Sequence, residues 1–495
     1  MSNLAQAFVP DYTTTKSSCD ATAKDLYFAL EKRAPAKSDL SIAREFLSRQ
    51  LAAARVLTVE LPEDIDAIAD WIALRTEQVG QQYRDYLGER KAGAPRRYFQ
   101  NKAHALYFLK MAAPTKLVDG SWLYGTLARW HAPEFRPLIQ IYLEELGNGV
   151  PGKNHVVLYK NLLALHGCDQ WRDIDDVHFT QGAIQLSLAF DADHFLPELI
   201  GYNLGYEQLP LHLLITSYEL NELGIDPYYF TLHVTVDNAA TGHAMKALQG
   251  LEHLMPRVGD AASFYHRVID GYRLNDLGAN TTSIIAEFDL EAELVDILRT
   301  KSVAGQNMHS DYCRVGGRTV NDWLSQPRQI PAFLKSLEST GWIKRGEAPE
   351  NSRFWRLIQS ERAEMFGVFS SYEQQVLQDW IWSMPAALAQ ENRAGHLAPR
   401  VPSFRAQQRA LDTSSPAAQN IERSGPMRGM VRHRFAGDEE GRQGFGADLR
   451  LLEQEIALPG NKNDAMNTII PLMSPTAHHT AAGLMATRVF IKLLG

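Results

Sequence analysis

Apolar residues recur at intervals of three and four along most of the chain, which is the spacing of one face of an α-helix. The pattern begins near Thr22, and several of its segments end at Gly or Pro. It is clearest over residues 40–54, 61–80, 103–111, 125–146, 155–166, 196–222 and 227–254. The pattern predicts a mainly α fold, built as a bundle of roughly seven to ten helices with few strands.

The pattern changes after Thr300, where glycines interrupt the periodicity, and helix is expected again over 330–337 and 371–382. Residues 391–434 contain eight Arg and three acidic residues among several Pro and Ser. This composition is typical of a solvated connector, and an anion-binding arm is the alternative. The last stretch, 448–495, is periodic again, and its sequence GLMATRVFIKLL suggests that it docks onto the main body.

At 495 residues the chain exceeds what one hydrophobic core usually holds. A large helical domain with appended structure is therefore expected. The predicted organisation is a flexible N-terminal arm (1–25), a helical domain (26–300), a helical extension (301–385), an Arg/Pro/Ser-rich linker (386–440) and a C-terminal helical segment (441–495).

Composition narrows the class of protein. Hydrophobic residues make up 45% and charged residues 22% of the chain, and the formal charge is -8, with no basic face for nucleic acid. The three cysteines are far apart, which favours a reducing cytoplasm over a disulfide framework. No leader pattern and no apolar run of about 18 residues is visible, so neither secretion nor a membrane partner is expected. The oligomeric state stays open, a homodimer included.

The first segment with candidate chemistry is IYLEELGNGVPGKNHVVLYKNLL. Glu145 is expected to end one helix and His155 to open the next, across a turn rich in Gly and Pro. On one straight helix the two would lie roughly 15 Å apart along the axis, whereas a turn brings them toward a common point. Surface or capping roles are the alternative for both residues, and Glu144 is a fallback for Glu145.

Glu207 stands in a second segment, PELIGYNLGYEQLPLHLL, among Leu and Tyr residues. A carboxylate buried among apolar residues requires a cationic partner, and a metal ion is one candidate. A partly exposed Glu near a kink at Pro210 is the alternative. Glu198 is a rival on roughly the opposite side of the same helix.

The third segment is DPYYFTLHVTVDNAATGHAMKALQGLEHL. His233 and Asp237 are four residues apart and share one face of a helix, where they can grip one ion. The alternative is a core histidine with Asp237 as its hydrogen-bond partner. His243 comes six residues after Asp237, about 240° around an ideal helix, so it reaches the same site only if the intervening stretch bulges or loops. Gly242 makes such a distortion cheap.

In chain order these segments resemble the haem-oxygenase-like diiron oxidases, also called iron-containing redox enzymes. The resemblance is specific over residues 100–260 and looser over KLVDGSWLYG and EMFGVFSSYEQQVLQDWI. Compact members read HxxxDxxH, whereas here Ala240 takes the last position and the histidine follows in the phrase DNAATGH, which resembles the longer members. The metal ligands that the resemblance implies are Glu145, His155, Glu207, His233, Asp237 and His243.

The resemblance implies a haem-oxygenase-like bundle that holds two iron ions per chain, uses O2 as co-substrate and takes electrons from an external donor. Three His and three carboxylates without Cys suit iron better than structural zinc. The expected activity is oxygenation, most simply N-oxygenation of an amine or amino-acid-like small molecule in a biosynthetic pathway. An oxidative decarboxylase or desaturase that gives an alkene, and a non-catalytic helical metal-binding protein, are the alternatives.

Several further residues are weaker candidates. Trp122, Tyr124, Tyr202 and Tyr229 could line a substrate site with Arg129 as a carboxylate anchor, although packing or surface roles are the simpler interpretation for each of them. Catalytic groups beyond the metal ligands, and an organic cofactor, are not expected.

The phrase MSPTAHHTAAG invites a metal role for His478 and His479. Thr480 as the N-cap of the last helix is the simpler interpretation, because neighbouring side chains diverge on a helix.

Overall fold

The computed structural model describes residues 21–495 except 33, 237–241, 360, 384–401 and 415–460, and this part of the chain is almost entirely helical. The strands found there, β1 (Arg314–Val315) and β2 (Arg318–Thr319), form one small antiparallel hairpin. The predicted mainly α fold class is confirmed. None of the described helices combines the length and the apolar composition that crossing a bilayer requires.

One extended hydrophobic core joins the helices of the bundle. Most of these helices bury one apolar face, and the packing of the buried faces stabilises the bundle more than helix propensity does. The bundle comprises α1 Ala23–Leu30, α2 Lys37–Ala54, α3 Ile68–Lys91, α4 Lys102–Met111, α5 Ala113–Lys116, η3 Ser121–Arg129, α6 Arg136–Glu145, α7 His155–His166, α8 Thr180–Phe190, α9 Leu196–Tyr206, α10 Leu211–Glu222, α11 Tyr228–Val236, α12 His243–Leu254, α13 Ala261–Arg273, η8 Leu274–Asp276 and α14 Thr281–Ala286.

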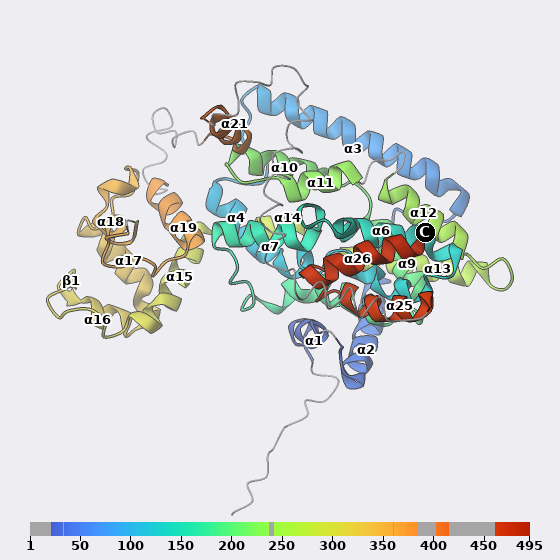
Figure 1. Ribbon diagram of the computed structural model, residues 1–495. Helices are drawn as coiled ribbons and strands as arrows, with labels where there is room; N and C mark the ends of the chain where they lie inside the picture. Colours follow the sequence, from blue (N-terminus) through green and yellow to red (C-terminus); the bar gives the residue numbers. More distant parts are fainter. Residues whose placement is uncertain (1–20, 33, 237–241, 360, 384–401, 415–460) are drawn as a thin grey trace, which may run out of the picture.

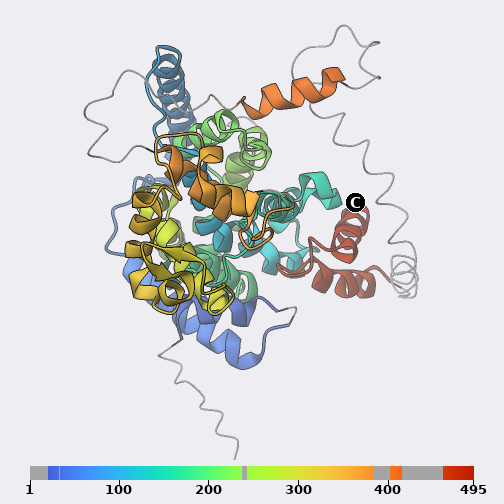
Figure 2. The same ribbon diagram turned by 90° about the vertical axis from the view of Figure 1, so that its left-hand side faces the viewer.

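A second group of helices forms a lobe beside the bundle, coloured yellow to orange in Figure 1 and facing the viewer in Figure 2. Its helices are α15 Leu290–Gly305, α16 Val320–Leu324, α17 Ile330–Ser339, α18 Arg353–Gln359 and α19 Ser371–Trp382. The carboxylate of Asp379 accepts a hydrogen bond from the backbone N–H of Ala103 at 2.7 Å, and Lys110 Nζ lies 3.4 Å from Glu293 Oε1. These polar contacts attach the lobe to α4.

The stretch predicted as a linker lies mostly outside the described residues. Its described part contains the helix α21 (Phe404–Ser414), whose described side chains are mostly exposed. The backbone N–H of Arg405 donates to Asn221 Oδ1 at 3.1 Å, which ties the start of α21 to α10.

The C-terminal segment consists of α25 (Lys462–Ile469), η12 (Ile470–Met473) and α26 (Ala481–Leu494), and it lies against the bundle as its apolar pattern predicts (Figure 1). The hydroxyl of Tyr142 donates to the backbone carbonyl of Met473 at 2.5 Å. The side chain of Thr480 accepts a hydrogen bond from the N–H of Gly483, so the predicted N-cap is confirmed.

The two histidines before α26 have protein partners. His478 Nδ1 lies 3.1 Å from Asn154 Nδ2, and His479 Nε2 lies 2.9 Å from Lys160 Nζ. Burial lowers the pKa of both imidazoles, so they are neutral hydrogen-bonding groups at pH 7. Within the part of the chain that the structure describes, neither belongs to a group of side chains that could hold a metal.

The turn between α6 and α7 determines where two candidate ligands lie. Gly147 has φ +63°, and a Cβ there would lie 2.4 Å from the backbone of Lys153 and Asn154, so only glycine fits. Asn154 then caps α7, because its Oδ1 accepts from the N–H of Val157 at 3.0 Å. Glu145 therefore ends α6 and His155 opens α7, as predicted.

Candidate metal centre

Two groups of buried side chains can each hold a metal ion. In each group, one potential ligand atom per residue lies within 4.8 Å of the others. The first group is Asp119, His155 and His233, and the second is Glu145, Glu207 and His243. Five of the six predicted ligands are thus brought together, and Asp119 is an additional member.

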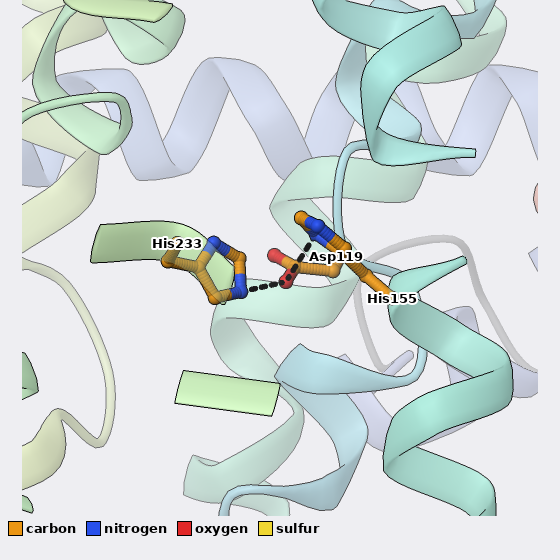
Figure 3. A group of neighbouring side chains, drawn as sticks. All are labelled: Asp119, His155 and His233. Atoms are coloured by element: carbon orange, nitrogen blue, oxygen red, sulfur yellow. Dashed lines mark ion pairs between the residues drawn. The ribbon is translucent and has the colours of Figure 1, made fainter. Parts of the chain in front are cut away.

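The first group is centred on the Asp119 carboxylate, which lies between α5 and η3 (Figure 3). Its Oδ2 is 3.5 Å from Nε2 of His233 on α11 and 3.9 Å from Nδ1 of His155 on α7. The imidazole ring centroids are 4.3 Å apart. Figure 3 shows both rings directed toward this carboxylate, so two helices and a turn that are distant in sequence converge on one point.

Two tyrosines orient Asp119. Tyr206 donates to Oδ1 at 2.9 Å and Tyr229 donates to Oδ2 at 2.5 Å. Burial opposes ionisation of Asp119, but the positive charge of Lys116 and the nearby histidines lower the pKa of the carboxyl to about 2. Asp119 is therefore a fixed anion, as a metal ligand must be.

The second group surrounds His243, the first residue of α12. Its Nδ1 lies 2.8 Å from Glu207 Oε2 and 3.4 Å from Glu145 Oε1, and its Nε2 lies 2.8 Å from Glu144 Oε2. Lys246 pairs with the other oxygen of Glu144. Glu144, the alternative candidate to Glu145, thus contacts the Nε2 side of the His243 ring and is not a member of the group.

The position of His243 agrees with the departure from a regular helix that its spacing required. α11, which carries His233, ends at Val236, and α12 begins at His243 with Gly242 as its N-cap residue. The two histidines therefore belong to different helices. Asp237 lies outside the described residues.

Glu145 joins the two groups. Its Oε2 contacts His155 Nδ1 of the first group, while its Oε1 faces His243 of the second. Gly120, with φ +77°, permits this approach, because a Cβ there would lie 2.7 Å from Glu145 Cβ. The two groups consequently adjoin each other.

The donor atoms fit iron. Glu207 Oε1 and His233 Nε2 are buried and form no hydrogen bond among the described residues, while Glu145 Oε2 and His155 Nδ1 have only each other. An unpartnered buried polar atom is costly, and metal ions between these atoms would satisfy them. Carboxylate oxygens and imidazole nitrogens without thiolate are the donor set of non-haem iron.

The remaining predicted residues lie elsewhere. Glu198 pairs with Arg267 through two hydrogen bonds of 2.6 and 2.7 Å, so it is not a member of either group. Arg129 pairs with Asp193 at the surface. Trp122 and Tyr202 are fully buried, with Nε1 and OH hydrogen-bonded to Asn203 and Gln181.

Tyr124 packs against Tyr142 and Phe190, and Tyr229 is the Asp119 partner described above. The carboxylate anchor proposed for Arg129 and the substrate contacts proposed for the aromatic residues therefore have no support in their surroundings.

Iron affinity is expected to rise with pH. Burial favours neutral imidazole, but the neighbouring carboxylates outweigh it, raising the pKa of His155 and bringing that of His243 to about 11. His243 is therefore protonated at pH 7 in the metal-free protein, and the carboxylates beside His155 favour its protonated form as well, so a metal must displace protons. His233 differs, because burial and His155 hold its pKa well below the ordinary value.

Anaerobic calorimetry of Fe(II) binding between pH 6.5 and 8.5 checks this, in buffers of different ionisation enthalpy that reveal released protons. Tighter binding at the higher pH, with proton release, is expected. Equal affinity across that range without proton release contradicts the assignment of these two histidines as ligands.

Comparison with known proteins locates the family. The family model described as iron-containing redox enzyme matches residues 106–274, the stretch that holds both groups. No curated protein and no solved structure matches the chain. This part of the chain, which carries the buried Asp, Glu and His side chains of both groups, is therefore similar to the iron-containing redox enzymes.

Proposed function

We propose that this protein is a non-haem diiron oxygenase that uses O2 and electrons from an external donor. The observation that carries the proposal is the pair of adjoining ligand groups joined through Glu145 and His155. A single mononuclear site needs only one such group. Iron bound there would supply the redox chemistry that organic side chains lack.

The protein's own residues prepare the site for that role. Tyr206 and Tyr229 fix the orientation of Asp119, and Glu144 with Lys246 fixes the ring of His243. Such outer contacts keep ligands in one rotamer and tune their basicity. The ligand side chains are buried in the apolar core, which shields them from bulk water except where a cavity reaches His233.

The proposed reaction is N-oxygenation of an amine or amino-acid-like small molecule. The resemblance of the DNAATGH phrase to longer family members supports this choice, and a cavity that reaches His233 supports a small-molecule substrate. Oxidative decarboxylation or desaturation to an alkene on the same site is the alternative reaction. A non-catalytic metal-binding protein is the alternative of a different class.

Iron loading and O2 consumption test the proposal. The protein is incubated anaerobically with Fe(II), freed of unbound iron and exposed to O2 with a panel of amino acids, polyamines and fatty acids. About two irons per chain, as two ligand groups require, and substrate-dependent O2 uptake are expected. Mass detection separates a product gaining oxygen at nitrogen from an alkene formed with loss of CO2 or of hydrogen.

A matched histidine pair provides the control. His233→Ala removes a member of the first group, while His266→Ala removes an exposed histidine on α13. Loss of iron and O2 uptake in the first variant alone is expected. Full iron content in His233→Ala, or no O2 uptake by the iron-loaded native protein with any compound, would leave only the metal-binding alternative.

A further inference from the structure

A cavity of about 730 Å³ opens onto the first ligand group. Its inner wall is built from α5, α10 and α11, and His233 itself is one of the lining residues. Its rim is formed by α3 and by the η8 region. A small molecule in this cavity therefore lies beside the candidate metal centre, and the polar groups of the wall decide which molecules fit.

Lys116 places a positive charge in this wall, and that charge also acts on the Asp119 carboxylate. It is the last residue of α5, and its side chain lines the cavity half-buried. One N–H of the ammonium group donates to Tyr206 OH at 3.0 Å. Among the described residues no carboxylate lies within ion-pair distance of Lys116, whereas Arg75, the cation at the rim, pairs with Glu60. An ammonium group has three N–H donors, so Lys116 retains donors for a ligand.

Helix α10 adds two polar groups to the same wall. His212 and Thr216 are four residues apart, so they lie on one face of the helix, and both line the cavity. The Thr216 hydroxyl is buried and has no hydrogen-bond partner in the described part of the chain. Burial and Lys116 lower the pKa of His212 to about 4, so its imidazole is neutral and offers one N–H. An unpartnered buried hydroxyl is costly unless a ligand satisfies it.

We infer that Lys116, Thr216 and His212 form an anion subsite that holds the carboxylate of the substrate beside Asp119 and His233. A single ammonium group with two neutral donors matches a monoanion such as a carboxylate better than a phosphate dianion. This inference rests on the proposed function in one respect, because it takes the bound carboxylate to be part of the substrate. It replaces Arg129, which pairs with Asp193.

The rim of the cavity carries the opposite charge. Asp276 of η8 is exposed at the rim, and no ion pair to it is found among the described residues. Burial and the negative charge of the nearby Glu60 raise the pKa of the Asp276 carboxyl. A cation at the distal end of the ligand relieves this repulsion. A small ligand with a carboxylate at one end and an amine at the other therefore fits both ends of the cavity.

Six-carbon probes test the subsite on the iron-free protein. Isothermal titration with hexanoate, hexylamine and 6-aminohexanoate compares a carboxylate, an amine and a molecule with the two groups at opposite ends. We expect hexanoate and 6-aminohexanoate to bind and hexylamine to bind at least about tenfold more weakly. Lys116→Met should weaken hexanoate binding about tenfold or more, Lys116→Arg only a few-fold, and Thr216→Val a few-fold.

Lys110→Met is the matched control. Lys110 lies on α4, pairs with Glu293 and does not line the cavity, so this variant should bind hexanoate like the native protein. Thermal unfolding of each variant verifies that it is folded. Equal hexanoate binding by the native protein and Lys116→Met, or no binding of either carboxylate to the native protein, overturns the subsite.

The iron-free assay separates this inference from the proposed function. Lys116-dependent binding in a protein that neither holds iron nor consumes O2 would support the subsite and reject the oxygenase. Substrate-dependent O2 uptake that is unchanged in Lys116→Met, together with unchanged binding, would reject the subsite and support the oxygenase.

Discussion

Replacing Asp119 by asparagine is expected to remove one of the two irons and to lower O2-dependent turnover by more than about 100-fold. The carboxylate is the only anionic member of the first group, and it faces both His155 and His233. Asparagine has the same shape and keeps an oxygen that can accept from Tyr206 or Tyr229. The charge is lost while the packing is kept, so the loss of iron reports on ligation. Iron analysis after anaerobic loading and O2-electrode rates measure the two effects.

Asp193→Asn is the control for this substitution, because Asp193 is exposed and pairs with Arg129 at the surface. It should retain both irons and full turnover. Asp119→Ala adds a test of stability, since it also leaves two tyrosine hydroxyls without their acceptor, and should cost about 2–4 kcal/mol of unfolding free energy. Two irons in Asp119→Asn would show that Asp119 pairs with the histidines electrostatically and does not bind metal.

The helices could be predicted from periodicity, but their breaks could not. The range 196–222 divides into α9 and α10 around Pro210, and residues 125–146 divide into part of η3 and the helix α6. Helix α8 was not among the predicted helices. Both of its faces are buried, so its apolar residues show little periodicity. Tertiary packing, which periodicity does not encode, decides these boundaries.

Most of the candidate site could be predicted because its segments resemble, in chain order, those of the iron-containing redox enzymes. Asp119 could not, because it lies between α5 and η3, where no helical spacing links it to another ligand. The signal that the sequence offered was the phrase KLVDGSWLYG, in which Asp119 is an acidic residue between Val118 and Gly120 in an apolar stretch. The resemblance favoured Glu207 over Glu198, and the fold adds that Glu198 pairs with Arg267 whereas Glu207 lies against His243.

Exchanging each of these two glutamates for glutamine should separate metal binding from stability. Glu207→Gln removes a buried anion of the second group and is expected to abolish its iron and reduce turnover more than about 100-fold. Its iron-free form should keep its unfolding free energy within about 1 kcal/mol, because His243 retains Glu144 and Glu145 as partners. Burial also raises the pKa of Glu207, so its charge is costly to keep without a metal.

Glu198→Gln should have the opposite effect. Glu198 is buried and pairs with Arg267, so losing its charge is expected to cost about 1–2 kcal/mol, less than for a fully buried pair because Arg267 stays partly in water. Its iron content and turnover should match those of the native protein. Denaturant unfolding and iron analysis are carried out on both variants. The assignment of Glu207 as a ligand requires that Glu207→Gln loses iron but keeps its stability, and that Glu198→Gln keeps its iron but loses stability. Iron loss in Glu198→Gln with full iron in Glu207→Gln would place the metal on the other face of α9.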